Sequence, residues 1–197
     1  MNQESLSSKQ SLDIITEMIT ISRKKIIDNG MHFILWGVLI ALCSFIQFFM
    51  LLFQYMPQES NFVWLILPIV GTPMSFIIGK KQNEETQVKS ILTEIYKKIW
   101  LGFGISLFLI IFISIQYHHS PTAFILILMG FAMFLSYLIL NFRPMLYGAV
   151  VFFVSSVLYI FIKESAFQAL FYGISVVLGY LIPGVLLYNK FKHQRNA

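Results

Sequence analysis

The side chains of this chain best suited to metal chemistry are two adjacent histidines, His118 and His119, at the end of an apolar run. Imidazole nitrogens are common metal ligands. Neighbouring positions on a helix point to different sides, however, unlike the i and i+4 spacing that places two histidines on one face. We therefore interpret the two residues as a solvated pair at a membrane surface, with a metal site as the alternative.

A nucleophilic active site lacks the residues that it needs. The single cysteine, Cys43, lies deep in the first apolar run, where a thiol behaves as a small hydrophobic side chain. It has no second cysteine with which to form an intrachain disulfide. The sequence shows no serine nucleophile elbow, phosphate-binding glycine loop or Walker motif. These observations predict a protein that is not an enzyme and carries no cofactor.

The composition around these residues is that of a membrane protein. Of 197 residues, 57% are hydrophobic and 12% are charged, compared with about 45–50% and 25% in soluble domains. Six apolar runs have no Asp, Glu, Lys or Arg between their ends, and their approximate limits are 32–54, 62–79, 99–117, 122–141, 144–162 and 167–189. A spanning helix needs about 20 apolar residues, so we predict an all-α bundle of six spans. A midplane without ionisable groups argues against proton-coupled transport and intramembrane acid proteolysis.

The polar segments divide the chain into three parts. Residues 1–30 form a polar N-terminal segment, residues 31–189 the six-span domain and residues 190–197 a basic tail. Apolar side chains recur on one helical face within residues 11–28 and again within residues 80–98, which predicts two amphipathic helices beside the membrane. The acidic residues of the N-terminal segment and the span-length run after it exclude a cleaved signal peptide.

The distribution of basic residues predicts the orientation. Of the 14 Lys and Arg residues, only Lys163 falls on one side of a six-span topology. The residues that set this bias include Arg23, Lys24, Lys25, Lys80, Lys81, Lys97, Lys98, Arg143, Lys190 and Lys192. Because flanking Lys and Arg remain cytoplasmic, we expect both termini in the cytoplasm, with anionic lipid headgroups as partners. The net charge of +5 then has a topological cause, and nucleic acid is not an expected partner.

Small residues and prolines within the spans predict close packing and kinks. The small residues spaced by four are Gly37 with Ala41, Gly102 with Ser106, and Ala169 with Gly173. Such pairs let helix backbones approach closely, either within one molecule or in a homodimer. Proline removes a backbone donor and kinks a helix. The predicted kinks, at different depths in the second and sixth spans, lie at Pro68, Gly71, Pro73, Pro183 and Gly184.

Two parts of the chain resemble a family of uncharacterised small bacterial membrane proteins with six spans. The first runs from residues 11–15 (SLDII) through residues 29–37 (NGMHFILWG), and the second covers residues 138–148 (LILNFRPMLYG). The shared features are an acidic and basic N-terminal helix, a Trp-Gly pair at the first span and a turn with an aromatic, a basic and a proline residue. This resemblance implies a bacterial inner-membrane location and no particular activity.

Three functional hypotheses are compatible with these features. The first is a sensor, scaffold or accessory subunit that binds a cytosolic protein through its amphipathic helices, although their apolar faces could instead lie on the lipid. The second is a small transporter or facilitator of a neutral or lipidic solute along the kinked spans. A polar cavity walled by Thr72, Ser75, Ser106 and Pro183 would favour transport, and a midplane packed solid would favour the first hypothesis. The third is an intramembrane enzyme near the histidine pair.

Overall fold

The computed structural model describes residue 16, residues 30–84 and residues 91–196, and these residues form helices and short connections without a strand. The α-helices are α2 (Gly30–Leu52), α3 (Thr72–Glu84), α4 (Ile91–Tyr117), α5 (Thr122–Leu140), α6 (Arg143–Tyr159), α7 (Ser165–Val176) and α8 (Ile182–Asn196). A 3-10 helix, η1 (Ser60–Leu65), and a π-helical segment, η2 (Leu67–Gly71), precede α3. A second π-helical segment, η3 (Val177–Leu181), joins α7 to α8. The all-α class predicted from the sequence is confirmed.

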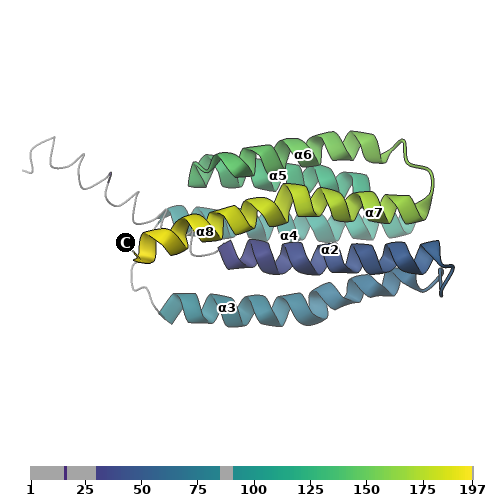
Figure 1. Ribbon diagram of the computed structural model, residues 1–197, viewed down its shortest axis with the longest axis horizontal. Helices are drawn as coiled ribbons and strands as arrows, with labels where there is room; N and C mark the ends of the chain where they lie inside the picture. The colour runs from purple at the N-terminus through teal and green to yellow at the C-terminus, as the bar shows by residue number, and fades with distance from the viewer. Residues whose placement is uncertain (1–15, 17–29, 85–90, 197) are drawn as a thin grey trace, which may run out of the picture.

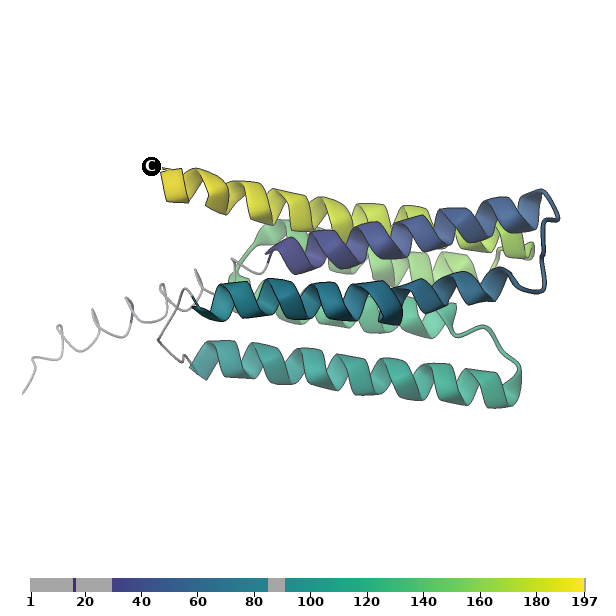
Figure 2. The same ribbon diagram turned by 90° about the horizontal axis from the view of Figure 1, so that it is seen from below.

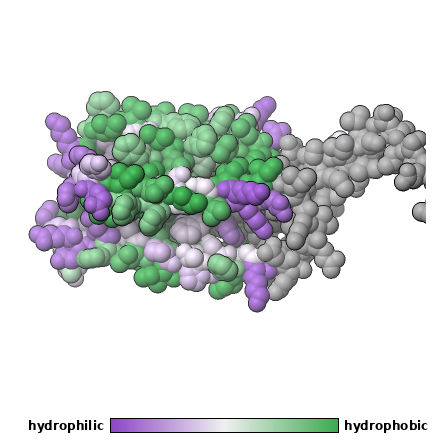
Figure 3. Space-filling model, turned by 180° about the vertical axis from the view of Figure 1, so that it is seen from behind, coloured by the Kyte–Doolittle hydropathy of each residue, from purple (hydrophilic) through white to green (hydrophobic). Residues whose placement is uncertain are grey.

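Five helical stretches among the described residues are long and apolar enough to cross a membrane. They are Gly30–Leu52, Ser60–Lys80, Glu94–Tyr117, Thr122–Leu140 and Ser165–Lys190. One further apolar helix, α6 in the fifth predicted span, has 17 residues. Its length of about 25 Å at the helical rise is slightly less than a hydrocarbon core of about 30 Å. Hydrophobic side chains cover the middle of the bundle and hydrophilic ones its two ends (Figure 3). The surface is therefore that of a membrane protein.

The two predicted amphipathic helices are not confirmed. Residues 11–28 lie outside the described residues except for Thr16. Within residues 80–98, the first five continue α3 and the last eight begin α4, so the described parts of this segment extend the neighbouring spans. The basic tail likewise begins as a continuation of α8, which runs to Asn196. The polar segments therefore lengthen helices at this end of the bundle.

The helices lie side by side in a bundle in which α2 packs along α7, η3 and α8, and α5 packs along α6 (Figure 1). Half of the apolar window in Ser165–Lys190 is buried, whereas only 6% is buried in Ser60–Lys80 and in Glu94–Tyr117. In Figure 2, α4 accordingly runs along one edge of the bundle. The first and sixth predicted spans thus belong to the core, and the second and third lie at its periphery.

The core is filled by large side chains from the last four apolar helices. The largest side chains with at most 1% exposure are Phe152, Leu126, Met133, Met145, Leu187 and Val176. Buried serines bond to carbonyl oxygens of their own helices, as when Ser136 Oγ donates to Ala132 O at 2.8 Å. Ser175 Oγ bonds in the same way to Phe171 O at 2.8 Å, and it lies 2.9 Å from Ser155 Oγ. These hydroxyls are therefore satisfied inside an apolar core.

The turn between α5 and α6 follows from its sequence. Asn141, which tolerates the left-handed conformation better than most residues, has φ 50° and donates its N–H to Tyr137 O at 2.7 Å. Phe142 is extended, and Pro144 occupies the first turn of α6. An N–H in this turn would have no intrahelical acceptor, so its absence in proline costs the helix no hydrogen bond. The turn therefore ends one helix and starts its antiparallel neighbour within a few residues.

A close backbone approach in the core joins α6 to η3. A Cβ added at Gly148 would overlap the carbonyl oxygen of Gly179, and a Cβ at Gly179 would lie 2.9 Å from Phe152 Cε2. Pro183 has no N–H, so an α-helical donor four residues after Gly179 is missing. The Gly179 carbonyl oxygen instead faces the backbone of Gly148, and only glycine leaves room for it.

This contact predicts the effect of a single methyl group. Gly148→Ala should lower the free energy of unfolding by about 1–3 kcal/mol, because the Cβ must displace the backbone of Gly179. Chemical denaturation of the purified protein in micelles measures the change. Gly104→Ala is the matched control: a Cβ at Gly104 meets no atom within 4 Å, so stability should be unchanged or rise by up to about 1 kcal/mol. Equal losses in the two variants would contradict the contact.

Candidate functional site

The two π-helical segments meet α2 at consecutive residues, Trp36 and Gly37. A Cβ added at Gly71, the last residue of η2, would lie 2.9 Å from Trp36 Cη2. A Cβ at Gly37 would lie 3.1 Å from the Cβ of Leu181, the last residue of η3. We name Trp36, Gly37, Gly71, Ser75 and Leu181 the Trp36–Gly37 junction. It is the place where the two interrupted spans contact the same helix.

Each π-helical segment ends two residues before a proline. Pro73 follows η2 and Pro183 follows η3. A proline cannot donate the N–H that closes the preceding α-helical turn, and its ring crowds the carbonyl four residues earlier. A π turn relieves both problems by inserting one residue and moving the bond to the fifth residue back, as in the bond from Ile182 N–H to Val177 O. Pro68 lies within the first two residues of η2.

The junction corrects one expectation from the sequence, which places the prolines at different depths in the second and sixth spans. Their contacts with α2 put Gly71 and Leu181, each two residues before a proline, at neighbouring positions along the same helix. Counting from the shared end of the two predicted runs already gives this agreement, because Pro73 lies six residues before the end of 62–79 and Pro183 six residues before the end of 167–189. Only counting from the opposite ends separates the two prolines, since the second run is the shorter one.

A hydrogen bond holds the second span to the junction. Trp36 Nε1 donates to Ser75 Oγ at 2.9 Å, one turn beyond Gly71. The indole ring lies close enough to η2 that only a glycine fits at position 71. In an apolar surrounding the indole N–H needs an acceptor, so this pair fixes the rotation of α3 relative to α2. Ser75, one of the residues whose convergence on a polar cavity would favour transport, is the acceptor of this bond.

The sixth span packs on α2 beyond the junction in both directions. On one side, a Cβ added at Gly184 would lie 2.7 Å from Phe33 Cβ, and one at Gly30 would lie 3.3 Å from the Cα of Tyr188. The ring of Phe33 also contacts two other aromatic rings, Tyr180 at 5.1 Å and Trp100 at 5.8 Å between centroids. Through Trp100 this aromatic cluster joins the peripheral α4 to the core.

On the other side of the junction, small residues and one serine form the contact. Ala41 and Ala169 are buried, and Ser44 Oγ donates to the Ala169 carbonyl oxygen at 2.6 Å. A Cβ added at Gly173 would lie 3.1 Å from Ser44 Cβ. Four of the six small residues singled out in the sequence thus lie on one seam between α2 and the sixth span. The remaining pair is on α4, where a Cβ added at Gly102 would meet no atom of another residue within 4 Å.

The histidine pair ends α4. His118 has φ 54°, and its N–H donates to Ile115 O at 3.3 Å. The N–H of His119 donates to Ser114 O at 3.1 Å. These two bonds, three and five residues back, are those of a Schellman motif with His118 in the left-handed position. In the described part of the chain no three His, Cys, Asp or Glu side chains come together. The backbone geometry gives the pair a structural role at the end of α4.

A polar clasp that was not predicted lies at the far end of α2. Gln47 Nε2 donates to Asn61 Oδ1 at 2.9 Å, and Trp64 Nε1 donates to Gln47 Oε1 at 2.9 Å. Cys43 Sγ lies 3.5 Å from the carbonyl oxygen of Val63. The signal in the sequence was a lone glutamine in an apolar run, but the partner on the next element could be identified only from the fold. The clasp attaches η1 to α2.

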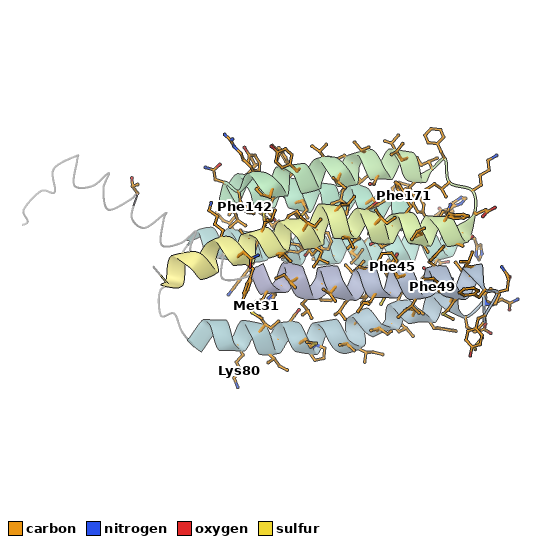
Figure 4. The ribbon with its side chains drawn as sticks, viewed as in Figure 1. Met31, Phe45, Phe49, Lys80, Phe142 and Phe171 are labelled. Atoms are coloured by element: carbon orange, nitrogen blue, oxygen red, sulfur yellow. The ribbon has the colours of Figure 1, made fainter. Side chains whose placement is uncertain are left out.

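The basic residues gather at one end of the described bundle. Lys80 and Phe142 lie at the same end as Met31, whereas Phe49 lies toward the opposite end (Figure 4). Lys190 Nζ lies 5.2 Å from the centroid of the Phe142 ring, in cation–π range. Lys163 belongs to the connection between α6 and α7 at the other end. Of the other topology-setting residues, Arg23, Lys24 and Lys25 lie outside the described residues.

The residues whose convergence on a polar cavity would favour transport lie in different surroundings. Thr72 is exposed on the outside of α3, Ser106 is half-buried on α4, and Pro183 is buried against the core. A groove of about 350 Å³ opens on the outer surface between α4, α5 and α6. Its lining is apolar throughout and consists of Ile110, Phe124, Ile127, Leu128, Phe131 and Phe153. This groove offers contact to a hydrocarbon chain and no polar group to a hydrophilic solute.

Comparison with known proteins adds no family: no family model matches the chain, and neither a curated protein nor a solved structure matches it.

The bond at the junction predicts coupled effects of two substitutions. Trp36→Phe and Ser75→Ala should each lower the free energy of unfolding, and the lost bond accounts for about 0.5–1.5 kcal/mol. The double variant should lose less than the sum of the single variants, because both remove the same bond. Chemical denaturation in micelles measures all three. Thr72→Ala, at an exposed position without a side-chain bond, is the control. Strict additivity would show that the bond does not contribute.

Proposed function

We propose that this chain is a non-enzymatic bundle of six spans in a bacterial inner membrane, acting as a sensor, scaffold or accessory subunit. The observation that carries the proposal is the filled centre of the bundle, where Met133 and Phe152 have no exposed surface. When the centre of a bundle is closely packed, the surfaces that remain for function are its two ends and its outer face. Polar helix extensions are present at one of these ends.

A sixth crossing is supported by the position of α6. Its 17 residues are followed by three more apolar residues, 160–162, which bring the apolar length to about 30 Å. Met145 and Phe152 are fully buried, so one face of α6 packs into the bundle along its length. An antiparallel neighbour joined to α5 by a two-residue turn returns to the opposite end. Six crossings then leave both termini on one side.

The placement of charge supports cytoplasmic termini. The end of the bundle that holds Lys80, Arg143 and Lys190 also holds the polar extensions of α3, α4 and α8. Basic residues at a membrane surface attract anionic headgroups at about 1 kcal/mol each. In the proposed orientation these residues anchor the bundle on the inner leaflet and display the helix extensions to cytosolic proteins.

Labelling of introduced cysteines tests the topology. In a Cys43→Ser background, Lys163→Cys should react with a membrane-impermeant maleimide added to intact cells, and Lys80→Cys should react only after the cells are opened. The reason is that the proposed six crossings place these two residues on opposite sides. Reaction of both residues in intact cells would refute the orientation.

One observation favours the transporter alternative. The two helix interruptions at the Trp36–Gly37 junction resemble in kind the broken helices of transporters. The apolar lining of the groove beside α4 fits a lipidic solute and offers no polar group to a hydrophilic one. The two candidate functions differ in what they require: the first needs a protein partner, whereas the second needs only the bundle and a membrane.

Crosslinking followed by purification separates them. A cytosolic protein should be crosslinked to the full chain, and deletion of residues 11–28 together with Lys97→Gln and Lys98→Gln should reduce its recovery at least several-fold, because these segments form the proposed binding surface. Lys163→Gln, at the other end, is the matched control. Unchanged recovery after both changes would refute the binding surface. Lipid transfer between leaflets of liposomes that contain only the purified bundle would instead favour the transporter.

A further inference from the structure

We propose that η2 and η3 are paired hinges, and that the helical arms beyond them, α3 and α8, change position together because both hinges bear on Trp36 and Gly37. The inference deepens the proposed function, since it supplies the moving part through which a sensor would alter its cytoplasmic end. It rests on that function only for the identification of the arms as cytoplasmic.

A span in lipid can bend only where its backbone bonds permit it. A backbone bond broken in hydrocarbon has no water to replace it, so an intact α-helix resists bending there. Pro73 and Pro183 have already removed the donors that α-helical turns would supply to Ile69 and Gly179. A change of angle at η2 or η3 therefore breaks no α-helical bond to these two carbonyls, and the longer π-type bonds, such as the one from Ile182 N–H to Val177 O, are the ones that adjust. The part of the chain that the structure describes has π-helical turns in these two spans alone.

The parts of the two spans before the hinges are held more firmly than the arms. Before η3, α7 is tied to α2 by the bond from Ser44 to the Ala169 carbonyl and to α6 by the Ser175–Ser155 pair. Before η2, the Gln47 clasp ties η1 to α2. The hinge η3 itself is held where Gly179 faces Gly148. These contacts provide a fixed base.

The arms have fewer such ties. On α3, the side chains of Phe76 and Ile77 are 79% and 69% exposed, and its bond to the core is the one from Trp36 to Ser75. On α8, Leu187 is fully buried, Gly184 lies under Phe33, and the ring of Phe142 faces Lys190, so packing contacts hold this arm. An arm that is held by side-chain contacts can move without unfolding its helix.

The two hinges are coupled through α2. Trp36 and Gly37 are adjacent, so their backbone positions are rigidly linked within that helix. Leu181 fills the space above Gly37, and the Trp36 ring fills the space above Gly71. A shift of Leu181 that moves α2 at Gly37 therefore also moves the indole that holds η2 and Ser75. The two arms respond to one displacement because a single pair of residues serves both hinges.

Spin-label distances in lipid nanodiscs test the proposal. In the Cys43→Ser background, labels at Ile77 and Asn189 report α3 and α8, each paired with a reference label at the exposed Tyr147 on α6. We expect broad or two-peaked distance distributions for both arm pairs. A control pair at two exposed positions on α5 and α6, Phe131 and Val157, should give one narrow distance.

Restoring the missing donor should stiffen both arms. Pro183→Ala returns an N–H to the sixth span, so the α8 distribution should narrow, and the α3 distribution should change with it although the substitution lies outside α3. Pro144→Ala is the matched control, because a proline in the first turn of a helix removes no intrahelical bond. A second variant, Ser75→Ala, releases α3 from Trp36 and should broaden the α3 distribution. It keeps the proposal testable if Pro183→Ala is not recovered folded.

Two results would overturn the proposal. One is a single narrow distance for both arm pairs in the unmodified bundle. The other is a pair of negative responses of α3: Pro183→Ala changes the α8 distribution alone, and Ser75→Ala leaves the α3 distribution unchanged. This result would show that the two hinges are not coupled. The nanodiscs contain no cytosolic protein, so this outcome is independent of partner binding. Coupled motion in nanodiscs combined with unchanged recovery in the crosslinking experiment would contradict the proposed function and leave the hinges intact.

Discussion

The fold depends on the contact between α2 and the continuous helical stretch of α7, η3 and α8, the sixth predicted span. Lipid provides no hydrophobic force to hold two apolar helices together, so their association relies on close packing and on a few hydrogen bonds. Glycine on one helix faces a larger residue on the other at several levels, with Gly37 under Leu181 and Gly184 under Phe33. The bond from Ser44 to the Ala169 carbonyl closes the same seam. The second span and α4 are then added to this pair at its edges.

The same environment explains the two interruptions. Every backbone polar group in hydrocarbon needs a partner within the protein, and a proline withdraws one donor from a span. In the sixth span the affected Gly179 carbonyl faces the backbone of Gly148, inside the core. In the second span the proline follows a π turn whose last residue, Gly71, receives the Trp36 ring. The interruption in the sixth predicted span is therefore enclosed by packing, whereas η2 is covered at Gly71 and exposes Ile69 and Val70.

Several features followed from the sequence because they are local. Long apolar runs without charge predict helices at their own positions, and the helices begin and end within a few residues of the predicted limits in the first and fourth spans. The positions of the prolines predicted interruptions in the second and sixth spans. The pattern of residues 80–98 predicts a separate helix, but its described parts continue the neighbouring spans, because helical hydrogen bonding does not stop where the hydrocarbon ends.

The sequence by itself determined the all-α class, the apolar segments and the sorting of basic residues toward one end, since each depends on the type of residue at a position and on its solvent. Only the tertiary structure decided that Trp36 and Gly37 serve both interruptions, that Gln47 binds Trp64, and that Gly102 lies open while Gly173 is enclosed. An apolar helix in lipid is hydrophobic on every side, so its pattern does not reveal which face meets which neighbour. That choice is made by the fit of small and large side chains between helices.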